Sequence, residues 1–187
     1  MKLVFATTNV GKLAELRELV TGLEVISAAE AAPGLEVEED ALTFEGNAEK
    51  KARAFLAATG LPSLADDSGL CVDALGGRPG VWSARYAPTD AERIAKLLGE
   101  LKGAQNRKAH FTCALCLALP GGAIERAVGE CHGEIIDGPR GAHGFGYDPV
   151  FFVPSLGKTL AELTRPEKAG LSHRGQAMRA MAPKLAR

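Results

Sequence analysis

The sequence has no excess of charge of either sign and no long apolar run. Its formal net charge at pH 7 is -1 over 187 residues, so nothing draws it generally to nucleic acid or to an anionic membrane. No apolar run approaches the roughly 20 residues that a membrane-spanning helix needs. The apolar run at residues 2–6 is too short for a signal peptide, and no small-residue cleavage site follows it. We therefore expect a cytoplasmic protein that binds neither nucleic acid nor a membrane.

Cysteine is scarce, and its four occurrences make no metal or redox motif. Cys113 and Cys116 have the CxxC spacing, but they lie in an apolar run at residues 109–119 that predicts a buried strand. Residues three apart on a strand point to opposite faces, so these two thiols cannot chelate one ion together. No second CxxC pair exists in the sequence. We interpret the cysteines as small buried hydrophobic residues.

The spacing of apolar residues predicts an α/β fold. Strands are expected at residues 2–6, 23–26, 108–119, 123–136 and 150–153, and helices at 13–20, 43–59, 90–101 and from 173 onward. Strands and helices alternate early in the chain, and a long hairpin follows. We therefore predict a mixed sheet with helices on both sides. The length fits one domain over residues 1–187, or one domain with two lobes.

The stretch Leu64–Tyr86 begins as a short apolar strand that is expected to end at two adjacent acids, Asp66 and Asp67. Ser68 and Gly69 follow at once. Because α/β proteins bind ligands at the carboxyl edge of their sheets, carboxylates at a strand end could hold Mg²⁺, which prefers hard oxygen donors. The same residue types also favour an ordinary turn. The sequence by itself leaves both interpretations open.

The exit of the first strand combines short polar side chains with a lysine, just before a helix begins. Its residues are Thr7, Thr8, Asn9, Val10, Gly11 and Lys12. The first N–H groups of a helix and the helix dipole attract anions, so the pattern favours polyphosphate binding. It is not a Walker A loop, which requires GxxxxGK[ST]. The alternative is a plain cap, in which Thr8 or Asn9 bonds to the first helical turn.

Opposite charges follow one another between residues 36 and 53. The acids come first, at Glu36, Glu38, Glu39, Asp40 and Glu45, and Lys50, Lys51 and Arg53 follow on the next helix. One interpretation is a solvated helix face, which is where most lysines lie. The other is that both signs of charge converge on one site, as phosphate and Mg²⁺ chemistry requires.

Two further motifs lie in the last third of the chain. In the loop at residues 144–149, two glycines flank an aromatic residue, which lets the backbone approach a planar ligand. Phe145 or Tyr147 could stack on a base, worth about 1–3 kcal/mol, or the loop could be structural with an aromatic plug. Lys168 and residues 172–174 (Ser-His-Arg) supply donors ahead of the last helix.

Four blocks, in order along nearly the whole chain, resemble the inosine triphosphate pyrophosphatases, also called non-canonical purine NTP or dITP/XTP pyrophosphatases. The blocks are TTNVGK at 7–12, LADDSGLCVDALGGRPGVWSARY at 64–86, GFGYDPVFFVPSLGKTLAEL at 144–163 and EKAGLSHRGQA at 167–177. The resemblance implies an elongated mixed sheet flanked by helices, two lobes with a central cleft, and a homodimer. It also implies Mg²⁺-dependent hydrolysis of ITP, dITP and XTP to the monophosphate and pyrophosphate, which cleanses the nucleotide pool.

The resemblance further implies roles for single residues. Thr7 to Lys12 would hold the phosphates, Asp67 would accept a proton and bind the metal, and Ser68 would touch the substrate. Glu39 would be the second metal ligand, and Lys51 would act with Asp67 on the phosphates. The residues around the base and sugar would be Phe145, Gly146, Tyr147, Asp148, Lys168, His173 and Arg174. The segment 43–48 reads TFEGNA where the family commonly has TFxENA, so the choice of glutamate within 36–45 stays open.

Two alternatives belong to other functional classes. A nucleotide-binding regulatory module would keep the glycine loops and basic residues but would not need Asp66, Asp67 and the acidic segment. A related house-cleaning pyrophosphatase would prefer modified pyrimidines or dTTP. Release of pyrophosphate from ITP with Mg²⁺ would distinguish a pyrophosphatase from the non-catalytic module. A substrate profile would distinguish the purine enzyme from the one that prefers pyrimidines.

Overall fold

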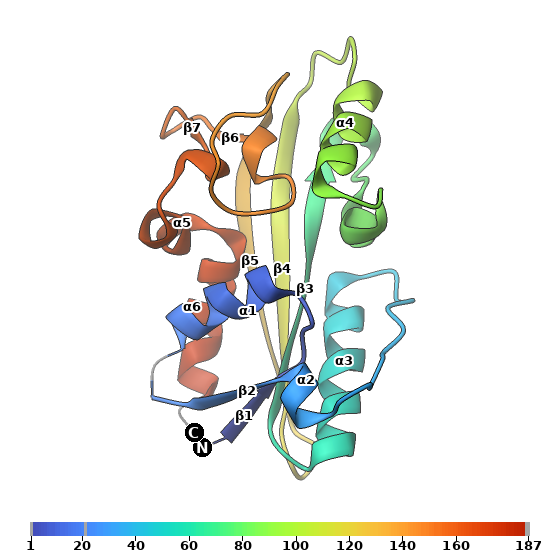
Figure 1. The fold of residues 1–187 in the computed structure, drawn as a ribbon, viewed down its shortest axis with the longest axis vertical. Helices are drawn as coiled ribbons and strands as arrows, with labels where there is room; N and C mark the ends of the chain where they lie inside the picture. Colours follow the sequence, from blue (N-terminus) through green and yellow to red (C-terminus); the bar gives the residue numbers. More distant parts are fainter. Residues whose placement is uncertain (1, 21, 186–187) are drawn as a thin grey trace. The chain divides into compact units, whose positions relative to one another are not determined.

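The computed structural model describes residues 2–20 and 22–185, which form one seven-stranded mixed sheet and its flanking helices (Figure 1). The strands are β1 (Lys2–Phe5), β2 (Glu24–Ser27), β3 (Ser63–Val72), β4 (Lys108–Ala118), β5 (Ile124–Ile135), β6 (Phe151–Val153) and β7 (Lys158–Thr159). The α-helices are α1 (Val10–Leu19), α2 (Ala28–Ala31), α3 (Phe44–Thr59), α4 (Asp90–Glu100), α5 (Arg165–Leu171) and α6 (His173–Leu185). Short 3₁₀ turns are η1 (Asp73–Leu75), η2 (Gly80–Arg85), η3 (Asp148–Val150) and η4 (Leu160–Glu162).

The strand order is β2-β1-β3-β4-β5-β6-β7. β1 pairs in parallel with β2 and β3, whereas β6 is antiparallel to both β5 and β7. The predicted mixed α/β sheet is therefore confirmed. No helix within the described part of the chain is long and apolar enough to cross a membrane.

The chain forms two compact units. Unit 1 contains residues 1–67, 113–129 and 174–187, and unit 2 contains residues 68–112 and 130–173. The strands β3, β4 and β5 contribute residues to both units. The elongated shape, the central cleft and the single domain over residues 1–187 stay predictions.

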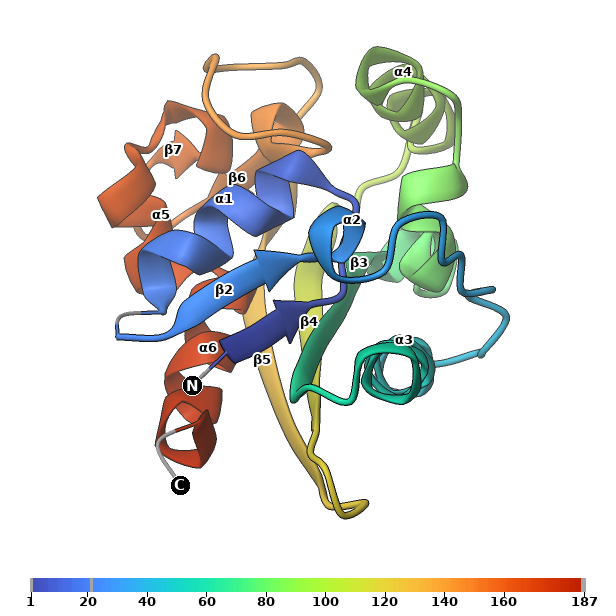
Figure 2. The same cartoon turned by 60° about the horizontal axis from the view of Figure 1, so that its bottom comes forward.

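Unit 1 buries apolar side chains on both faces of its strands, as the alternation along β1 shows. Leu3 and Phe5 belong to a core with residues of α1 and α6, while Val4 and Ala6 belong to a core with residues of α2 and α3. Successive residues of a strand point to opposite faces, so the two cores lie on opposite sides of the sheet (Figure 2). The prediction of helices on both sides is correct for this unit.

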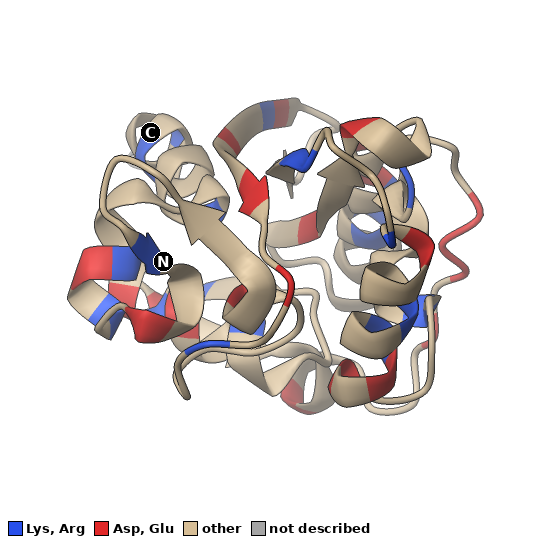
Figure 3. Ribbon diagram, turned by 90° about the horizontal axis from the view of Figure 1, so that it is seen from above, with Lys and Arg blue, Asp and Glu red and all other residues tan. Residues whose placement is uncertain are grey.

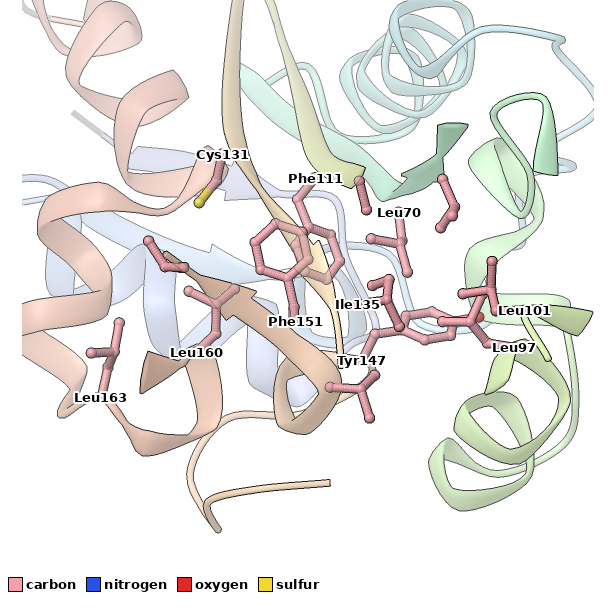
Figure 4. Close-up of a cluster of buried hydrophobic side chains, with 14 residues drawn as sticks. Leu70, Leu97, Leu101, Phe111, Cys131, Ile135, Tyr147, Phe151, Leu160 and Leu163 are labelled. Carbon is pink, nitrogen blue, oxygen red and sulfur yellow. The ribbon is translucent and has the colours of Figure 1, made fainter. Parts of the chain in front are cut away.

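Unit 2 has a core of its own, centred on aromatic residues (Figure 4). The rings of Phe111 and Phe151 have centroids 4.7 Å apart. Leu97 of α4 and Leu101, which directly follows this helix, pack into the same core. Tyr147 is buried there as well, and its hydroxyl donates a hydrogen bond to the Ser83 carbonyl at 2.8 Å.

The capping residues in the sequence predict both ends of α3 correctly, but the expected end of β3 at the acid pair is wrong. Thr43 caps α3 by accepting a hydrogen bond from the Gly46 N–H at 3.1 Å, and Gly60 ends it with a left-handed φ of 68°. β3 does not stop in a turn after Asp67 but continues to Val72. Leu70 and Val72 are fully buried in the core of unit 2, and this packing keeps the chain extended through the acid pair.

The thiols give a direct test of the packing. Burial raises the pKa of Cys113 to about 12 and the pKa values of Cys116 and Cys131 to about 11, whereas Cys71 is half-exposed. A raised pKa lowers the thiolate fraction, and the thiolate is the reactive species. In a DTNB titration at about pH 8, we expect the native protein to show one accessible thiol, Cys71, and the guanidinium-unfolded protein to show all four. Two or more fast-reacting thiols in the native protein would contradict this packing.

Candidate active site

The polar loop after β1 leads directly into the amino end of α1. Asn9 is the N-cap, and its Oδ1 accepts a hydrogen bond from the Lys12 N–H at 3.0 Å. The Thr7 hydroxyl oxygen accepts one from the Asn9 N–H at 3.2 Å. Thr8, Asn9 and Val10 are exposed. The cap interpretation is therefore correct for Asn9, and the exposed loop also leaves the positive end of the α1 dipole open to an anion.

Asp66 and Asp67 are neighbours in sequence but point to opposite faces of β3, because the strand continues through them. Asp66 lies on the face of Leu64, which packs with α1 and α6. Asp67 lies on the face of Ala65, which packs with α2 and α3. The two acids therefore have different partners.

Asp66 is fully buried among cations. Its Oδ2 lies 2.9 Å from Lys12 Nζ and 3.6 Å from Arg174 Nη2. Arg174 also forms an ion pair with Glu15 of α1. Burial by itself would raise the pKa of Asp66, but Lys12, Arg174 and Lys51 outweigh it and hold that pKa well below its ordinary value. Asp66 is therefore an ionised anchor for Lys12.

Asp67 is held by a neutral donor. The Asn47 side chain donates a hydrogen bond from Nδ2 to Asp67 Oδ2 at 3.0 Å. Burial raises the pKa of Asp67, and the nearby Glu39 carboxylate adds to this rise, whereas Lys51, Lys12 and the Asn47 hydrogen bond oppose it. Asp67 is therefore the better proton acceptor of the two acids, since a base of higher pKa binds a proton more readily.

Lys51 joins the acidic segment to β3. Its Nζ lies 2.7 Å from Glu39 Oε1. Burial by itself would lower the pKa of Lys51, but Asp66, Glu39 and Asp67 reverse this effect and raise it. The expectation of a solvated face is therefore wrong for Lys51, whereas Lys50 and Arg53, on the same helix, are exposed.

These side chains form the charged cluster of unit 1, which contains three cations and four carboxylates. Its members are Lys12, Lys51, Arg174, Glu15, Glu39, Asp66 and Asp67. Acidic and basic segments are interspersed along the ribbon (Figure 3). Since the cluster has no surplus of positive charge, a polyphosphate would need an additional cation to bind there.

The donor set of the cluster fits Mg²⁺. Its oxygen donors are carboxylates, with Glu39 and Asp67 close enough for their charges to interact. Within residues 2–20 and 22–185, no group of three or more His, Cys, Asp or Glu residues could hold a metal ion. Mg²⁺ is usually bound by one or two carboxylates plus substrate phosphates, so two carboxylates are enough for this ion.

Unit 2 brings together most of the residues expected around the base. Lys168 Nζ lies 2.7 Å from Asp148 Oδ2, and both side chains are buried. The same carboxylate oxygen accepts a hydrogen bond from the Phe145 N–H at 3.0 Å. Lys168 Nζ also lies 4.9 Å from the centre of the Phe145 ring. The Gly146 N–H donates to Asp90 Oδ2 at 2.8 Å, which fastens this loop to the start of α4.

The other expected residues have different surroundings. The ring of Tyr147 is occupied by core contacts, so Phe145 is the aromatic side chain left as a candidate for stacking on a base. His173 is buried, and its ring stacks on Phe111 with centroids 4.7 Å apart. Arg174 lies with Asp66 and Glu15 in unit 1. Ser68 is half-buried on β3.

Sequence reasoning assigned no role to Glu15, Asn47 and Asp90, which organise these groups. It considered Asp66 only as a possible Mg²⁺ ligand beside Asp67, whereas the structure pairs Asp66 with Lys12 and Arg174. The signal for Asn47 lay in the block TFEGNA, where a buried helix position carries an amide that is a poor helix former. The signal for Asp66 was its place inside an apolar strand, where a charge must be paired.

The comparisons with known proteins match nearly the whole chain, and they agree with one another on its family. A family model described as the Ham1 family matches residues 3–184. A protein of Gloeobacter violaceus named dITP/XTP pyrophosphatase is 52% identical over 177 residues, covering 95% of this chain and 90% of that protein. The solved structure of the Staphylococcus aureus Ham1 protein superposes with a TM-score of 0.91 at 40% identity, covering 100% of this chain and 98% of that chain. A HAM1 protein from Coxiella burnetii gives the same TM-score and coverage at 44% identity. These matches confirm the resemblance seen in the four sequence blocks: the chain belongs to the Ham1 family.

Proposed function

We propose that this protein hydrolyses the non-canonical purine nucleoside triphosphates ITP, dITP and XTP to the monophosphate and pyrophosphate, with Mg²⁺ as cofactor. The observation that carries the proposal is the charged cluster of unit 1, in which the proton-accepting Asp67 lies beside Lys51 and Glu39. Membership of the Ham1 family and the name of the Gloeobacter violaceus relative support the same reaction.

The triphosphate is assigned to the loop from Thr7 to Lys12 and to Lys51. Lys12 and Lys51 would offset charge on the phosphates, and the amino end of α1 would receive one of them. Asp67 would take a proton from the attacking water, which adds to the α-phosphorus while pyrophosphate leaves in line. Asp67 and Glu39 would hold Mg²⁺, which when bound offsets polyphosphate charge as a Lewis acid.

The base is assigned to Phe145, Lys168 and the residues around them. Hypoxanthine and xanthine carry an oxygen at position 6, where adenine carries an amino group. Lys168 and His173 are the candidate donors to that oxygen, and adenine would forfeit these bonds, which supports discrimination. Arg174, the third residue assigned to the base, already pairs with Glu15 and Asp66. Guanine shares the 6-oxygen, so its rejection has to act on its 2-amino group.

A substrate profile tests the proposal. We expect kcat/KM for ITP, dITP and XTP to exceed the values for ATP, GTP and dTTP by at least about tenfold. A site built to bond the 6-oxygen rejects adenine because adenine lacks it, whereas the rejection of GTP has to act on the 2-amino group of guanine. The measurement is pyrophosphate release with each nucleotide, with and without Mg²⁺. Comparable kcat/KM values for all purine nucleotides would contradict the proposed specificity. A preference for dTTP would favour a pyrimidine house-cleaning enzyme. Binding without release would favour a non-catalytic module.

A homodimer, a cytoplasmic location and a single two-lobed domain complete the proposal. The homodimer and the two-lobed domain are supported by the resemblance of the four sequence blocks to the inosine triphosphate pyrophosphatases, and the cytoplasmic location is the default expectation from the sequence. Sedimentation of the purified protein tests the dimer.

A further inference from the structure

Asn47 is an unusual residue for its position. It lies in the first half of α3, where asparagine is a poor helix former, and its side chain is fully buried. A buried amide without partners costs about 1–3 kcal/mol. Here the amide makes three side-chain hydrogen bonds, one through Oδ1 and two through Nδ2. They join two different parts of the chain to α3.

The first part is the end of the acidic segment. Asn47 Oδ1 accepts a hydrogen bond from the Ala41 N–H at 2.9 Å, and Nδ2 donates to the Ala41 carbonyl at 3.3 Å. This pair of bonds fixes both polar groups of one residue's backbone. Ala41 comes two residues after Glu39, and consecutive Cα atoms are about 3.8 Å apart, so anchoring Ala41 limits where Glu39 can lie.

The second part is β3. The remaining Nδ2 hydrogen bond goes to Asp67 Oδ2, 20 positions along the chain. Lys51, one helical turn after Asn47 on the same face of α3, holds the Glu39 carboxylate. One short stretch of α3 therefore holds Glu39 and Asp67, the two carboxylates assigned to the cation.

The chemistry of the donor matters. The Asn47 amide N–H orients the Asp67 carboxylate without adding a positive charge. An ammonium group, such as the one that Lys51 presents to Glu39, orients a carboxylate but also competes with a metal ion for it. Asp66, which pairs with Lys12 and Arg174, shows the contrasting arrangement. Hydrogen-bonded groups behind metal ligands typically change metal affinity by about 10–100-fold when they are removed.

We propose that Asn47 is a positioning residue that fixes Asp67 and the segment bearing Glu39 in one arrangement, and thereby sets the affinity of the site for a divalent cation. The inference rests on the proposed function only in taking Glu39 and Asp67 as the cation ligands. The hydrogen bonds of the Asn47 side chain go to Ala41 and Asp67 and not to residues 7–12, so its effect is expected on the cation rather than on nucleotide binding.

The test compares Asn47→Leu, which keeps the branching at Cγ but removes the hydrogen-bonding groups, with Ser63→Ala as a matched control. Ser63 is buried on β3 in the same unit, and its hydroxyl donates to the Leu61 carbonyl at 3.0 Å. Binding of Mn²⁺ alone, measured by water-proton relaxation, is expected to weaken by about tenfold or more in Asn47→Leu and to be unchanged in Ser63→Ala. At saturating Mg²⁺, the KM for ITP is expected to change by less than about threefold.

Unchanged Mn²⁺ affinity in a folded Asn47→Leu protein, or an equal loss in Ser63→Ala, would overturn the inference. If Asn47→Leu does not fold, NMR of the wild-type protein decides: the Asn47 side-chain amide signals must shift on addition of Mg²⁺, while those of the exposed Asn106 must not. An absent shift for Asn47 would overturn it. If the wild type binds Mn²⁺ through this site but hydrolyses no nucleotide, the proposed function fails and the role of Asn47 stands.

Discussion

Replacing Asp67 by asparagine is expected to lower kcat by about 10²-fold or more while leaving the protein folded. The amide keeps the size of the carboxylate and retains an oxygen to accept the Asn47 hydrogen bond. It lacks the basic oxygen that takes the proton, and a positioned base contributes about 10²–10⁴-fold. The measurement is the steady-state rate of pyrophosphate release from ITP at saturating Mg²⁺. Turnover near the wild-type value would contradict the assignment of Asp67 as the proton acceptor.

The thermal stability of Asp67→Asn gives a second readout, because it is expected to stay equal or to rise while kcat falls. Because burial raises the pKa of Asp67 above its ordinary value of 3.8, ionising this group costs stability at neutral pH. Without divalent cations, Asp67→Asn is therefore expected to have a Tm equal to or above that of the wild type. Asp73→Asn, at an exposed position in η1, serves as the control and should change neither rate nor Tm. A falling Tm together with lost activity would show that Asp67 supports the fold rather than the reaction.

Replacing Asp66 by asparagine is expected to have the largest effect on stability, about 3–5 kcal/mol. The change leaves the buried Arg174 and the half-buried Lys12 without their shared carboxylate, and breaking a buried ion pair from one side costs about this much. The expected fall in Tm is on the order of 10 °C for a chain of this length. Asp40→Asn makes the same chemical change in an exposed ion pair with Lys50 and should cost less than about 1 kcal/mol.

The difference in the free energy of unfolding between the wild type and Asp66→Asn should depend on pH, because the pKa of Asp66 is lowered in the folded protein. A carboxyl group whose pKa is lower in the folded state adds stability above its unfolded pKa of 3.8, and loses it as the pH falls through the folded value. Urea denaturation measures the free energy of unfolding of both proteins at about pH 7 and at about pH 3. The difference between the wild type and Asp66→Asn should be smaller at the lower pH. A gap that is constant or widens in acid would contradict the ionised state assigned to Asp66.

The sequence predicted best those elements whose signals are local. α3 begins at a Thr cap and ends at a glycine, and both signals lie within a few residues of the boundary. β3 was ended too early because Asp-Ser-Gly favours a turn locally, whereas distant core residues keep the strand extended. α5 was missed because it is only seven residues long, although Thr164 and Glu167 form a capping box at its start.

The sequence could name candidate site residues one by one, but not the contacts between them. The sequence resemblance named Asp67, Lys12 and Lys51, and the structure adds which group each of them faces. Those partners depend on tertiary contacts: Arg174 meets Glu15 across 159 positions of the chain. No local pattern indicates that Asp66 takes the cations and Asp67 the amide, because this division depends on how β3 continues between the helices on its two faces.

The products of one reaction test the central claim most directly. ITP is incubated with the protein and Mg²⁺ in ¹⁸O-labelled water, and the products are followed by ³¹P NMR. Attack on the α-phosphorus predicts equal amounts of the monophosphate and pyrophosphate, with the label in the monophosphate. Formation of the diphosphate with orthophosphate, or label in pyrophosphate, would contradict the assignment of the charged cluster to cleavage between the α- and β-phosphates.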